Sequence, residues 1–455
     1  MSEVKEISIG REYHPKILKE YGKYDAPALQ AYVSKVGEKL AAFSHRPGLV
    51  YRFTVLDSTD VNAFALPGGY IYITRGLLAY LNTEAELAAV LGHEIGHVTA
   101  RHGVRQQTAA TAANIGMTIG QILVPELRNQ AVFNMYGLLS GAFLSGYGRE
   151  HELEADGLGA EYLARAGYDP YAIVEVLKVL KSQAEFSSEI AESEGRKTQA
   201  YHGLFASHPD NDTRLQNVIS NKRLLYVRPT PIKDDDNFLA LLSGLVFGDS
   251  AAEGIRRKNK FYHRTLGFAV YFPEGWVLKN HPESLQGVAP KGKAFAALTL
   301  QDINKLITPR KFLTERLDFK QFTNGRKIEP AGLQGYTAFV EINSTAGMRH
   351  ARVCIIYFND RAYMLVGIAK DVQLQNDVND KILKTALSFH PLSKKEAILA
   401  EPLIIQLQRA TAAITYKKLA GESRLPGYAE SQLRLLNHQY PKGEPVPGKM
   451  LKIVR

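Results

Sequence analysis

The sequence predicts an α+β fold: a helix-rich domain with a small sheet, then an α+β sheet domain and a small tail. Three observations support this prediction. The first half repeats apolar residues at the helical spacing of three and four, residues 261–392 alternate as strands do, and the last residues return to short helices. With 455 residues, at about 150 per domain, roughly three domains are expected. An apolar content of 45% and the lack of a long biased run exclude a disordered or fibrous chain.

The N-terminal part, residues 1–232, is predicted to form one helix-rich domain. Strands are expected at 51–56 and at 70–74, the second after the turn Pro67-Gly68-Gly69. The chain becomes rich in Pro and Asp around residues 229–236, and we interpret residues 233–260 as a linker. Helical periodicity marks four segments, 27–43, 84–102, 149–165 and 170–184.

Residues 261–392 are predicted to form an α+β domain without a cluster of reactive groups. Helical patterns occur at 309–317 and 379–388. The residues Gly267, Pro273 and Trp276 resemble those of PsbP/Mog-like sheet domains, and this resemblance implies a fold and a binding role rather than chemistry. Strands are expected at 268–272, 294–301, 336–342, 350–358 and 361–368.

The tail, residues 393–455, is similar to a LysM-type module. Two short helices, at 415–420 and 428–437, precede a final strand near 447–454, and the resemblance implies carbohydrate or peptidoglycan binding. The first strand and the usual Gly-Asp-Thr turn of such modules are not recognisable in the sequence.

Cysteine content and hydropathy exclude two further classes of protein. Cys354 is the single cysteine, so neither a disulfide framework nor a cysteine-rich zinc ribbon is expected, and its apolar neighbours predict a packing residue in a strand. No apolar stretch reaches the roughly 18–20 residues of a membrane span, so no transmembrane segment is expected. The start at Met1 has no hydrophobic leader, which indicates a cytosolic protein or one whose native leader is missing from this chain.

The net charge of +10 is unevenly distributed along the chain. Residues 1–255 hold 24 Lys and Arg against 30 Asp and Glu, whereas residues 256–455 hold 32 against 16, a net +16. A basic C-terminal half favours anionic partners, such as peptidoglycan or an anionic envelope polymer. Its charges are scattered and lack the basic and aromatic pattern that reads bases, so no nucleic-acid partner is expected.

One long helix is predicted around the segment His93-Glu94-Ile95-Gly96-His97. Thr83 and Glu86 are spaced as a capping box at its start, and Gly103 is expected to end it in a left-handed conformation. The helix should have about five turns.

Within this helix, His93 and His97 are spaced to bind one metal ion. Residues four apart lie on one helix face, so both imidazoles can reach the same cation, and that spacing suits zinc. Glu94 lies about 100° round the helix, where its carboxylate can reach the attacking water without binding the ion. An uncompensated His and Glu would be costly in so apolar a helix, which also favours a metal.

A catalytic zinc needs a third protein ligand, and the second helix offers one. Glu152 and Asp156 are four residues apart on one face, so one carboxylate can bind the metal while the other accepts a hydrogen bond from a ligand histidine. Glu150, His151 and Glu154 remain rival ligands at this point.

The two motifs together resemble those of the gluzincin zinc metallopeptidases, a family that includes the CAAX prenyl endopeptidases, HtpX and the Oma-type proteases. In its sequence pattern the chain is most similar to the soluble periplasmic BepA-like branch, over roughly residues 5–225. The resemblance implies a zincin-type metallopeptidase domain with one zinc ion per chain on His93, His97 and Glu152. It also implies Glu94 as general base, and Asp156 as the partner of a ligand histidine.

Two more segments match this family. Asn62, Ala63 and Phe64 belong to a segment similar to the family's substrate-side strand, whose backbone would grip an extended peptide. His208, before Pro209, and Arg214 are similar to its His-Pro and Arg element. His208 would bind the zinc in a resting state or donate to the developing oxyanion with the help of Arg214, unless it merely precedes a helix.

The sequence therefore predicts a zinc endopeptidase that cleaves polypeptides, namely misfolded or envelope proteins, in the bacterial periplasm or cell envelope. Residues 105–148, rich in Ala, Gly and Met, are predicted to cover the cleft as a movable plug, or else to form a core hairpin. The alternative function is an envelope assembly factor, chaperone or cell-wall binding protein with a latched or structural zinc. Peptidoglycan hydrolysis is a third hypothesis, which the peptide-binding strand makes weaker.

Overall fold

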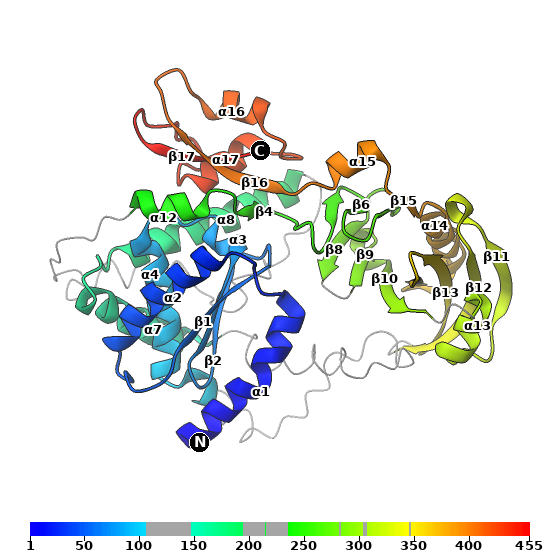
Figure 1. The fold of residues 1–455 in the computed structure, drawn as a ribbon, viewed down its shortest axis with the longest axis horizontal. Helices are drawn as coiled ribbons and strands as arrows, with labels where there is room; N and C mark the ends of the chain where they lie inside the picture. Colours follow the sequence, from blue (N-terminus) through cyan, green and yellow to red (C-terminus); the bar gives the residue numbers. More distant parts are fainter. Residues whose placement is uncertain (106–146, 194–213, 215–234, 282–283, 304–306, 345–346) are drawn as a thin grey trace. The chain divides into compact units, whose positions relative to one another are not determined.

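The computed structural model describes residues 1–105, 147–193, 214, 235–281, 284–303, 307–344 and 347–455 (Figure 1). These residues form two compact units. The first contains the described residues up to Gly248 together with Leu403–Arg455, and the second contains those of Asp249–Pro402. The residues of the predicted metal site lie in the first unit.

Helix α1 (Glu3–Tyr21) opens the first unit, although the sequence analysis did not predict it. Ser2 caps its first turn by accepting a hydrogen bond from the Lys5 amide, and Pro15 lies inside the helix. Few of its residues are buried, so its apolar periodicity is weak. Ion pairs add to the packing of its buried Ile9 and Ile17, because the buried Glu6 pairs with both Arg46 and Arg101.

A three-stranded sheet follows, in the order β1 (Arg52–Leu56), β3 (Tyr70–Thr74), β2 (Ala63–Leu66). Strand β3 is parallel to β1 and antiparallel to β2, which lies at the edge. The sequence analysis predicted β1 and β3 as strands. Alternate residues of β2 enter two different apolar clusters, one with helices α2 (Pro27–Ala42) and α4 (Glu84–Thr99), the other with α1. Because both faces are buried, β2 lacks the alternation that marks a half-exposed strand.

Helix α4 starts where the sequence predicts but ends differently. The Thr83 hydroxyl accepts a hydrogen bond from the Glu86 amide at 3.1 Å. The Glu86 carboxylate accepts from the Asn82 amide at 2.7 Å, one residue before the position that a capping box requires. The predicted left-handed stop at Gly103 is wrong: the helix ends at Thr99, and Arg101 takes the left-handed conformation with φ 59°.

Two further helices pack beside α4. Helix α7 (Arg149–Arg165) coincides with its predicted range, and α8 (Ala172–Ser193) runs longer than predicted. A four-residue helix, α3 (Arg75–Leu78), joins β3 to the loop before α4. These elements share one apolar cluster with the sheet and α2.

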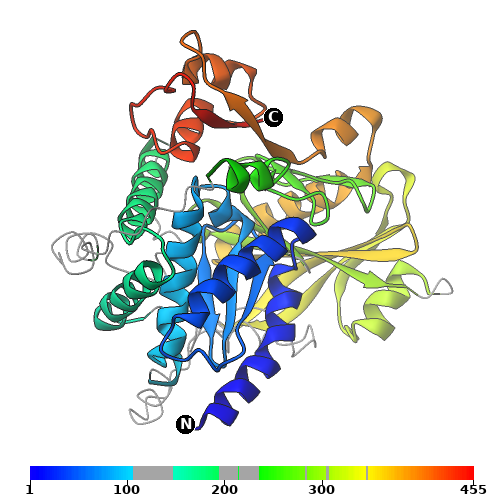
Figure 2. The same ribbon diagram turned by 60° about the vertical axis from the view of Figure 1, so that its left-hand side comes forward.

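The C-terminal residues complete the same unit. Strand β16 (Leu403–Arg409) pairs with β17 (Met450–Val454) on one side and with β4 (Val246–Phe247) on the other. Figure 2 shows the tail beside α8 and α12. The tail has the order strand, helix, helix, strand, because α16 (Tyr416–Glu422) and α17 (Ala429–Leu436) separate β16 from β17. Sequence analysis did not recognise β16, and the likeness to a LysM module stays a prediction.

Part of the stretch predicted as a linker is packed into this core. Residues 235–242 form helix α12 (Asp235–Leu242), whose Phe238 and Leu242 are fully buried. Both side chains belong to the apolar cluster that contains α4.

The tail also holds the loop that leads into α4. The Lys452 ammonium, fully buried, donates hydrogen bonds to the carbonyl oxygens of Ala79 at 2.5 Å and Leu81 at 2.9 Å. The His438 ring lies 2.7 Å from the carbonyl oxygen of Tyr80. Burial lowers the pKa of Lys452, while the charge of the buried Glu86 opposes that shift. Three successive carbonyls before the helix are thus held by the tail.

The second unit is built on a seven-stranded sheet in the order β11-β12-β13-β14-β10-β9-β8. Alternate residues of β13 face opposite sides: Cys354 and Ile356 pack toward α14 (Gln375–Leu387), whereas Val353 and Ile355 pack toward Phe312. A smaller sheet has the order β15-β7-β6-β5. The strands of the two sheets are β5 (Ile255–Arg257), β6 (Lys260–His263), β7 (Phe268–Tyr271), β8 (Val277–His281), β9 (Ser284–Val288), β10 (Ala294–Asp302), β11 (Thr323–Ile328), β12 (Gly335–Ser344), β13 (Gly347–Phe358), β14 (Arg361–Ala369) and β15 (His390–Pro391).

The remaining helical turns of this unit are short. Helix α13 (Pro309–Lys311) continues into a π-helical turn, Phe312–Arg316, where the sequence predicts one helix, and α15 (Lys394–Leu399) follows β15. Cys354 is buried in β13 as predicted, and burial raises the pKa of its thiol to about 11. Within the described residues of both units, we find no helix of sufficient length and hydrophobicity to span a bilayer.

The replacement Lys452→Met tests how strongly the tail holds the loop before α4. It leaves two buried carbonyls without their donor and Glu86 without a nearby buried cation, so we expect the free energy of unfolding to fall by about 3 kcal/mol. Urea denaturation measures this change. Lys449→Met, at an exposed position just before β17, is the control and should stay within about 0.5 kcal/mol of the parent. Equal stability of the two variants would contradict the prediction.

Candidate metal centre

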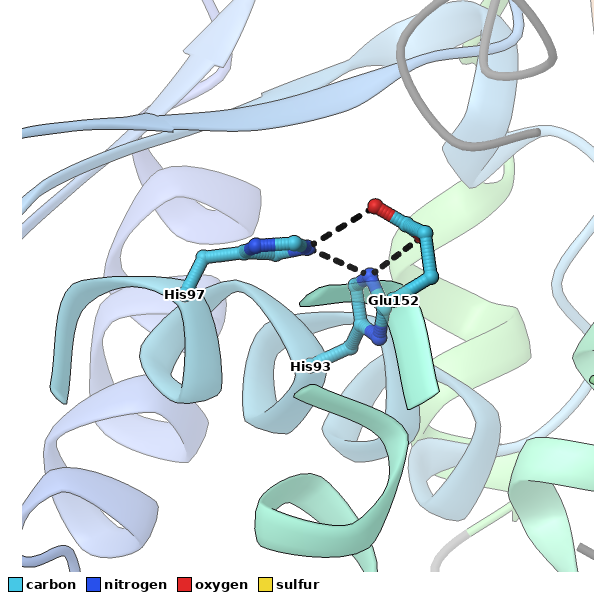
Figure 3. A group of neighbouring side chains, drawn as sticks. All are labelled: His93, His97 and Glu152. Carbon is cyan, nitrogen blue, oxygen red and sulfur yellow. Dashed lines mark hydrogen bonds and ion pairs between the residues drawn. The ribbon is translucent and has the colours of Figure 1, made fainter. Parts of the chain in front are cut away.

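Three side chains from two helices converge in the first unit: His93 and His97 of α4 and Glu152 of α7 (Figure 3). The two histidine Nε2 atoms lie 2.9 Å apart. The Glu152 carboxylate lies 3.5 Å from Nε2 of His93 and 3.4 Å from Nε2 of His97. All three residues are buried, and among the described residues they are the group whose ligand atoms meet closely enough for one metal ion.

Close packing of α4 on α7 brings the carboxylate to the imidazoles. A Cβ atom on Gly96 would lie 2.9 Å from the carbonyl oxygen of Ala155, and a Cβ atom on Gly159 would lie 3.0 Å from the amide nitrogen of His93. Only the absence of side chains at these positions lets the two backbones approach so closely. Because a glutamate side chain is short, Glu152 reaches both histidines only at this helix separation.

The second nitrogen of His93 is held by Asp156. Its Nδ1 atom lies 2.8 Å from the Asp156 carboxylate, one helical turn beyond Glu152 on the same face of α7. Hydrogen bonding of this kind places the proton of His93 on Nδ1 and turns the lone pair of Nε2 toward the other ligand atoms.

Arg214 is buried and contacts Asp156, the partner of His93. Its guanidinium donates to both oxygens of Asp156, at 2.8 and 2.7 Å, and pairs with Glu152 at 3.2 Å. Burial raises the pKa of Asp156, but the Arg214 charge and the hydrogen bonds from Arg214 and His93 outweigh it and lower that pKa to about 2. Asp156 is therefore ionised at neutral pH.

The electrostatic surroundings of His93 stabilise positive charge on or next to its imidazole. Burial and the Arg214 charge lower the pKa of His93, whereas its hydrogen bonds to Asp156 and Glu152 raise it, with a net rise to about 9. The two carboxylates that attract a proton to this imidazole would attract a metal ion in the same way.

Glu94 is buried on α4 beside the converging side chains. It lines a small pocket together with His93, Arg214 and apolar residues of α8. The apolar part of this lining is Ile173, Val176, Leu177 and Leu180.

The rival ligands on α7 lie elsewhere. Glu150 is exposed at the start of the helix, and the His151 ring stacks on that of His102 with centroids 4.3 Å apart. The Glu154 carboxylate is 43% exposed and accepts a hydrogen bond from Arg105 at 2.7 Å. The structure thus groups Glu152, and none of these three, with the two histidines.

The predicted substrate strand is β2 with the residue before it. The Asn62 backbone is bonded to Thr74, and Ala63 and Phe64 are buried, the Phe64 ring stacking on Tyr72 with centroids 4.9 Å apart. Their side chains therefore belong to the core. The end of β2, at Ala65 and Leu66, borders a second small pocket that His97 and Tyr147 also line.

Two predictions concern residues outside those that the structure describes. His208 belongs to 194–213, and most of the predicted plug belongs to 106–146.

Sequence reasoning missed two neighbours of His97. The Tyr147 ring stacks on the His97 ring with centroids 4.1 Å apart and an interplanar angle of 18°. His102 lies 2.8 Å from Nδ1 of His97. The spacing of five residues between the two histidines could have indicated the second contact.

The side chains fit a zinc ion. Two imidazole nitrogens and a carboxylate are the donors of many zinc sites, and Asp156 gives His93 the partner that ligand histidines usually have. With their protons on Nδ1, the two Nε2 lone pairs would face each other at 2.9 Å, and a shared cation removes that repulsion.

This arrangement is typical of metallopeptidase domains of the zincin class: a His-Glu-Ile-Gly-His helix, a glutamate from a second helix and a small sheet with an antiparallel edge strand. Residues 27–222 match the model of peptidase family M48, and the chain is similar to that family over this range.

Known proteins similar to the chain cover only part of it. It is 32% identical over 219 residues to the beta-barrel assembly-enhancing protease of Yersinia pestis, a match that covers 47% of this chain and 42% of that protein. It is 36% identical over 154 residues to the mitochondrial metalloendopeptidase OMA1 of Arabidopsis thaliana, covering 33% of this chain and 30% of that one. The chain thus spans less than half the length of these relatives.

A solved structure, cyanobacterial PsbP from Synechocystis, is 14% identical and covers 32% of this chain and 98% of its own, with a TM-score of 0.25. A likeness at this level supports no argument about the present fold or its ligand.

Gly96→Ala tests the dependence of the metal centre on helix packing. The new methyl group would meet the Ala155 carbonyl, so we expect a loss of about 1–3 kcal/mol in the free energy of unfolding, together with a lower zinc content. Gly157→Ala is the matched control, because a Cβ atom there meets nothing within 4 Å among the described residues. The control should gain about 0.5–1 kcal/mol. Denaturation of the metal-free proteins and atomic absorption of the loaded ones measure both effects, and full zinc binding by Gly96→Ala would refute the argument.

Proposed function

We propose that this protein is a zinc-dependent endopeptidase. The observation that supports this most is the convergence of His93, His97 and Glu152, buried and drawn from two helices, with Asp156 behind His93. Three protein ligands leave a coordination position for water or substrate, which is typical of catalytic rather than structural zinc. One ion per chain is expected.

A bound zinc ion would lower the pKa of a coordinated water from about 16 toward about 7 and would polarise the scissile carbonyl. The Glu94 carboxylate would take the proton of the attacking water and pass it to the leaving amine. Its place on α4, next to a ligand but on another side of the helix, suits that role. No covalent bond between the chain and its substrate is required.

Arg214 and Asp156 would position the ligands. Arg214 bonds to Asp156 and pairs with Glu152, so its cation balances two buried carboxylates and fixes their orientation. For His208 the prediction stands as made: it would bind the zinc in a resting state or donate to the oxyanion, with Arg214 assisting.

Polypeptides are the proposed substrates. Strand β2 is paired with β3 on one side, and within the described part of the chain no strand covers its other edge. Its backbone could therefore bind an extended peptide as an added strand, with little demand on sequence, and Ala63 and Phe64 belong to that strand. Asn62 would hold the start of the strand, because its backbone is already hydrogen-bonded to Thr74. The name of the Yersinia relative, a beta-barrel assembly-enhancing protease, supports polypeptides as substrates. Misfolded or envelope proteins as targets, and the bacterial periplasm or cell envelope as location, are part of this proposal.

A second role in binding is supported by the tail. Its strand, helix, helix, strand order fits the predicted LysM-like module, and the basic C-terminal half would favour peptidoglycan or another anionic envelope polymer. The alternative function is an envelope assembly factor whose zinc is latched by His208 or is structural, and His208→Ala distinguishes it from a peptidase. If the protein is a latched protease, this variant should cleave peptides several-fold faster than the parent. If the variant binds zinc but stays inactive, a binding function is favoured over hydrolysis.

Glu94→Gln tests the proposed chemistry. The amide cannot accept the water proton, so cleavage of unfolded casein should fall by about 100- to 10,000-fold while zinc content stays at one per chain. Fluorescent casein and atomic absorption measure the two quantities. Glu161→Gln, a partly exposed position on α7, is the control and should cleave at the parent rate. Cleavage by Glu94→Gln at the parent rate would sink the assignment of the general base.

A further inference from the structure

His102 occupies an unusual place beside the metal centre. It comes three residues after the last residue of α4, and the left-handed conformation of Arg101 (φ 59°) turns the chain back just before it. Its side chain is fully buried, and its ring lies against that of His97 with centroids 4.9 Å apart and an interplanar angle of 71°. The Nδ1 atoms of the two rings are 2.8 Å apart.

The hydrogen-bond roles of this pair follow from the metal site. Nε2 of His97 faces His93 and Glu152, so it is the nitrogen that would bind the cation. A neutral imidazole that binds through Nε2 holds its proton on Nδ1, and His97 therefore donates from that atom. Two N–H groups cannot face each other at 2.8 Å, so Nδ1 of His102 must be the acceptor.

The second nitrogen of His102 then has a determined role as well. With Nδ1 accepting, the proton of His102 lies on Nε2, which is 3.1 Å from a carboxylate oxygen of Glu154. The same oxygen accepts a hydrogen bond from Arg105 at 2.7 Å. The donors and acceptors are consistent at every step from His97 through His102 to Glu154.

We propose that His102 is a positioning residue for the metal ligand His97, and that Glu154 is the carboxylate at the far end of the hydrogen-bond series His97–His102–Glu154. Each ligand histidine then has its own anionic partner: Asp156 acts directly on His93, and Glu154 acts on His97 through one neutral imidazole. These hydrogen bonds fix the His97 tautomer and ring orientation before the metal binds. This inference rests on the proposed function only in requiring a metal ion at the site.

Three variants of the full-length protein test the inference through zinc affinity, measured by competition with a chromophoric chelator. His102→Leu removes the acceptor, and the affinity should fall by about 10- to 100-fold. His102→Asn keeps an oxygen acceptor near the former Nδ1 position, so it should recover most of that loss. Glu154→Ala should give a smaller loss than His102→Leu, because His102 can still accept from His97.

The absorption spectrum of the cobalt-substituted proteins provides a readout that is independent of activity. A change in the orientation of His97 should shift the visible bands in His102→Leu and leave them near the parent position in His102→Asn. The matched control is His151→Phe, which keeps an aromatic ring against His102 and should hold zinc within about threefold of the parent. Circular dichroism of the metal-free proteins checks that each variant is folded.

The outcomes separate this inference from the proposed function. Unchanged zinc affinity in His102→Leu would overturn it, as would a loss in His102→Asn equal to that in His102→Leu. An equal loss in His151→Phe would also overturn it, because ring packing alone would then explain the effect. A failed peptidase would instead bind zinc normally in the parent protein and cleave nothing.

Discussion

The close contact of α4 with α7 is the constraint on which the metal centre depends. At Gly96 and Gly159 the two backbones approach to distances that a Cβ atom would prevent. The Glu152 carboxylate then lies within 3.5 Å of both histidines, and Asp156 meets His93 one turn further along. Small residues at the crossing and acidic residues beside it are therefore two parts of one arrangement, because a wider separation would leave buried charges without partners.

Charge balance explains why so polar a cluster can be buried. Glu152 and Asp156 are both nearly inaccessible, and Arg214 is the cation that faces them. On the other side, His97 is linked to His102 and so to Glu154, which is partly exposed. The site thus has one side, around His93, where the charges are buried and ion-paired. On its other side, hydrogen bonds connect His97 through His102 to the solvent-exposed Glu154. A metal cation would add positive charge beside Glu152, whose carboxylate is already held in place by Arg214, so little reorganisation would accompany its binding.

The rest of the first unit holds α4 at both ends. Near its start, Lys452 and His438 of the tail contact the carbonyls of residues 79–81. Near its end, Arg101 pairs with the buried Glu6 of α1. Segments from the two ends of the sequence therefore restrain one helix, and the tail is part of the core that contains the metal centre.

The sequence by itself determined the local elements of the site. The spacing of His93 and His97, the acidic pair on α7 and the threonine cap of α4 are local patterns, because hydrogen bonds and side-chain faces in a helix depend only on nearby residues. Strands β1 and β3 could be predicted for the same reason, because their patterns are also local in the sequence. The tertiary structure decided which acidic residue joins the histidines, since Glu152 and Glu154 differ only in the face of α7 that each occupies relative to α4. It also decided the places of β2, α1 and His102, whose burial comes from contacts with distant segments and leaves no periodic signal in the chain.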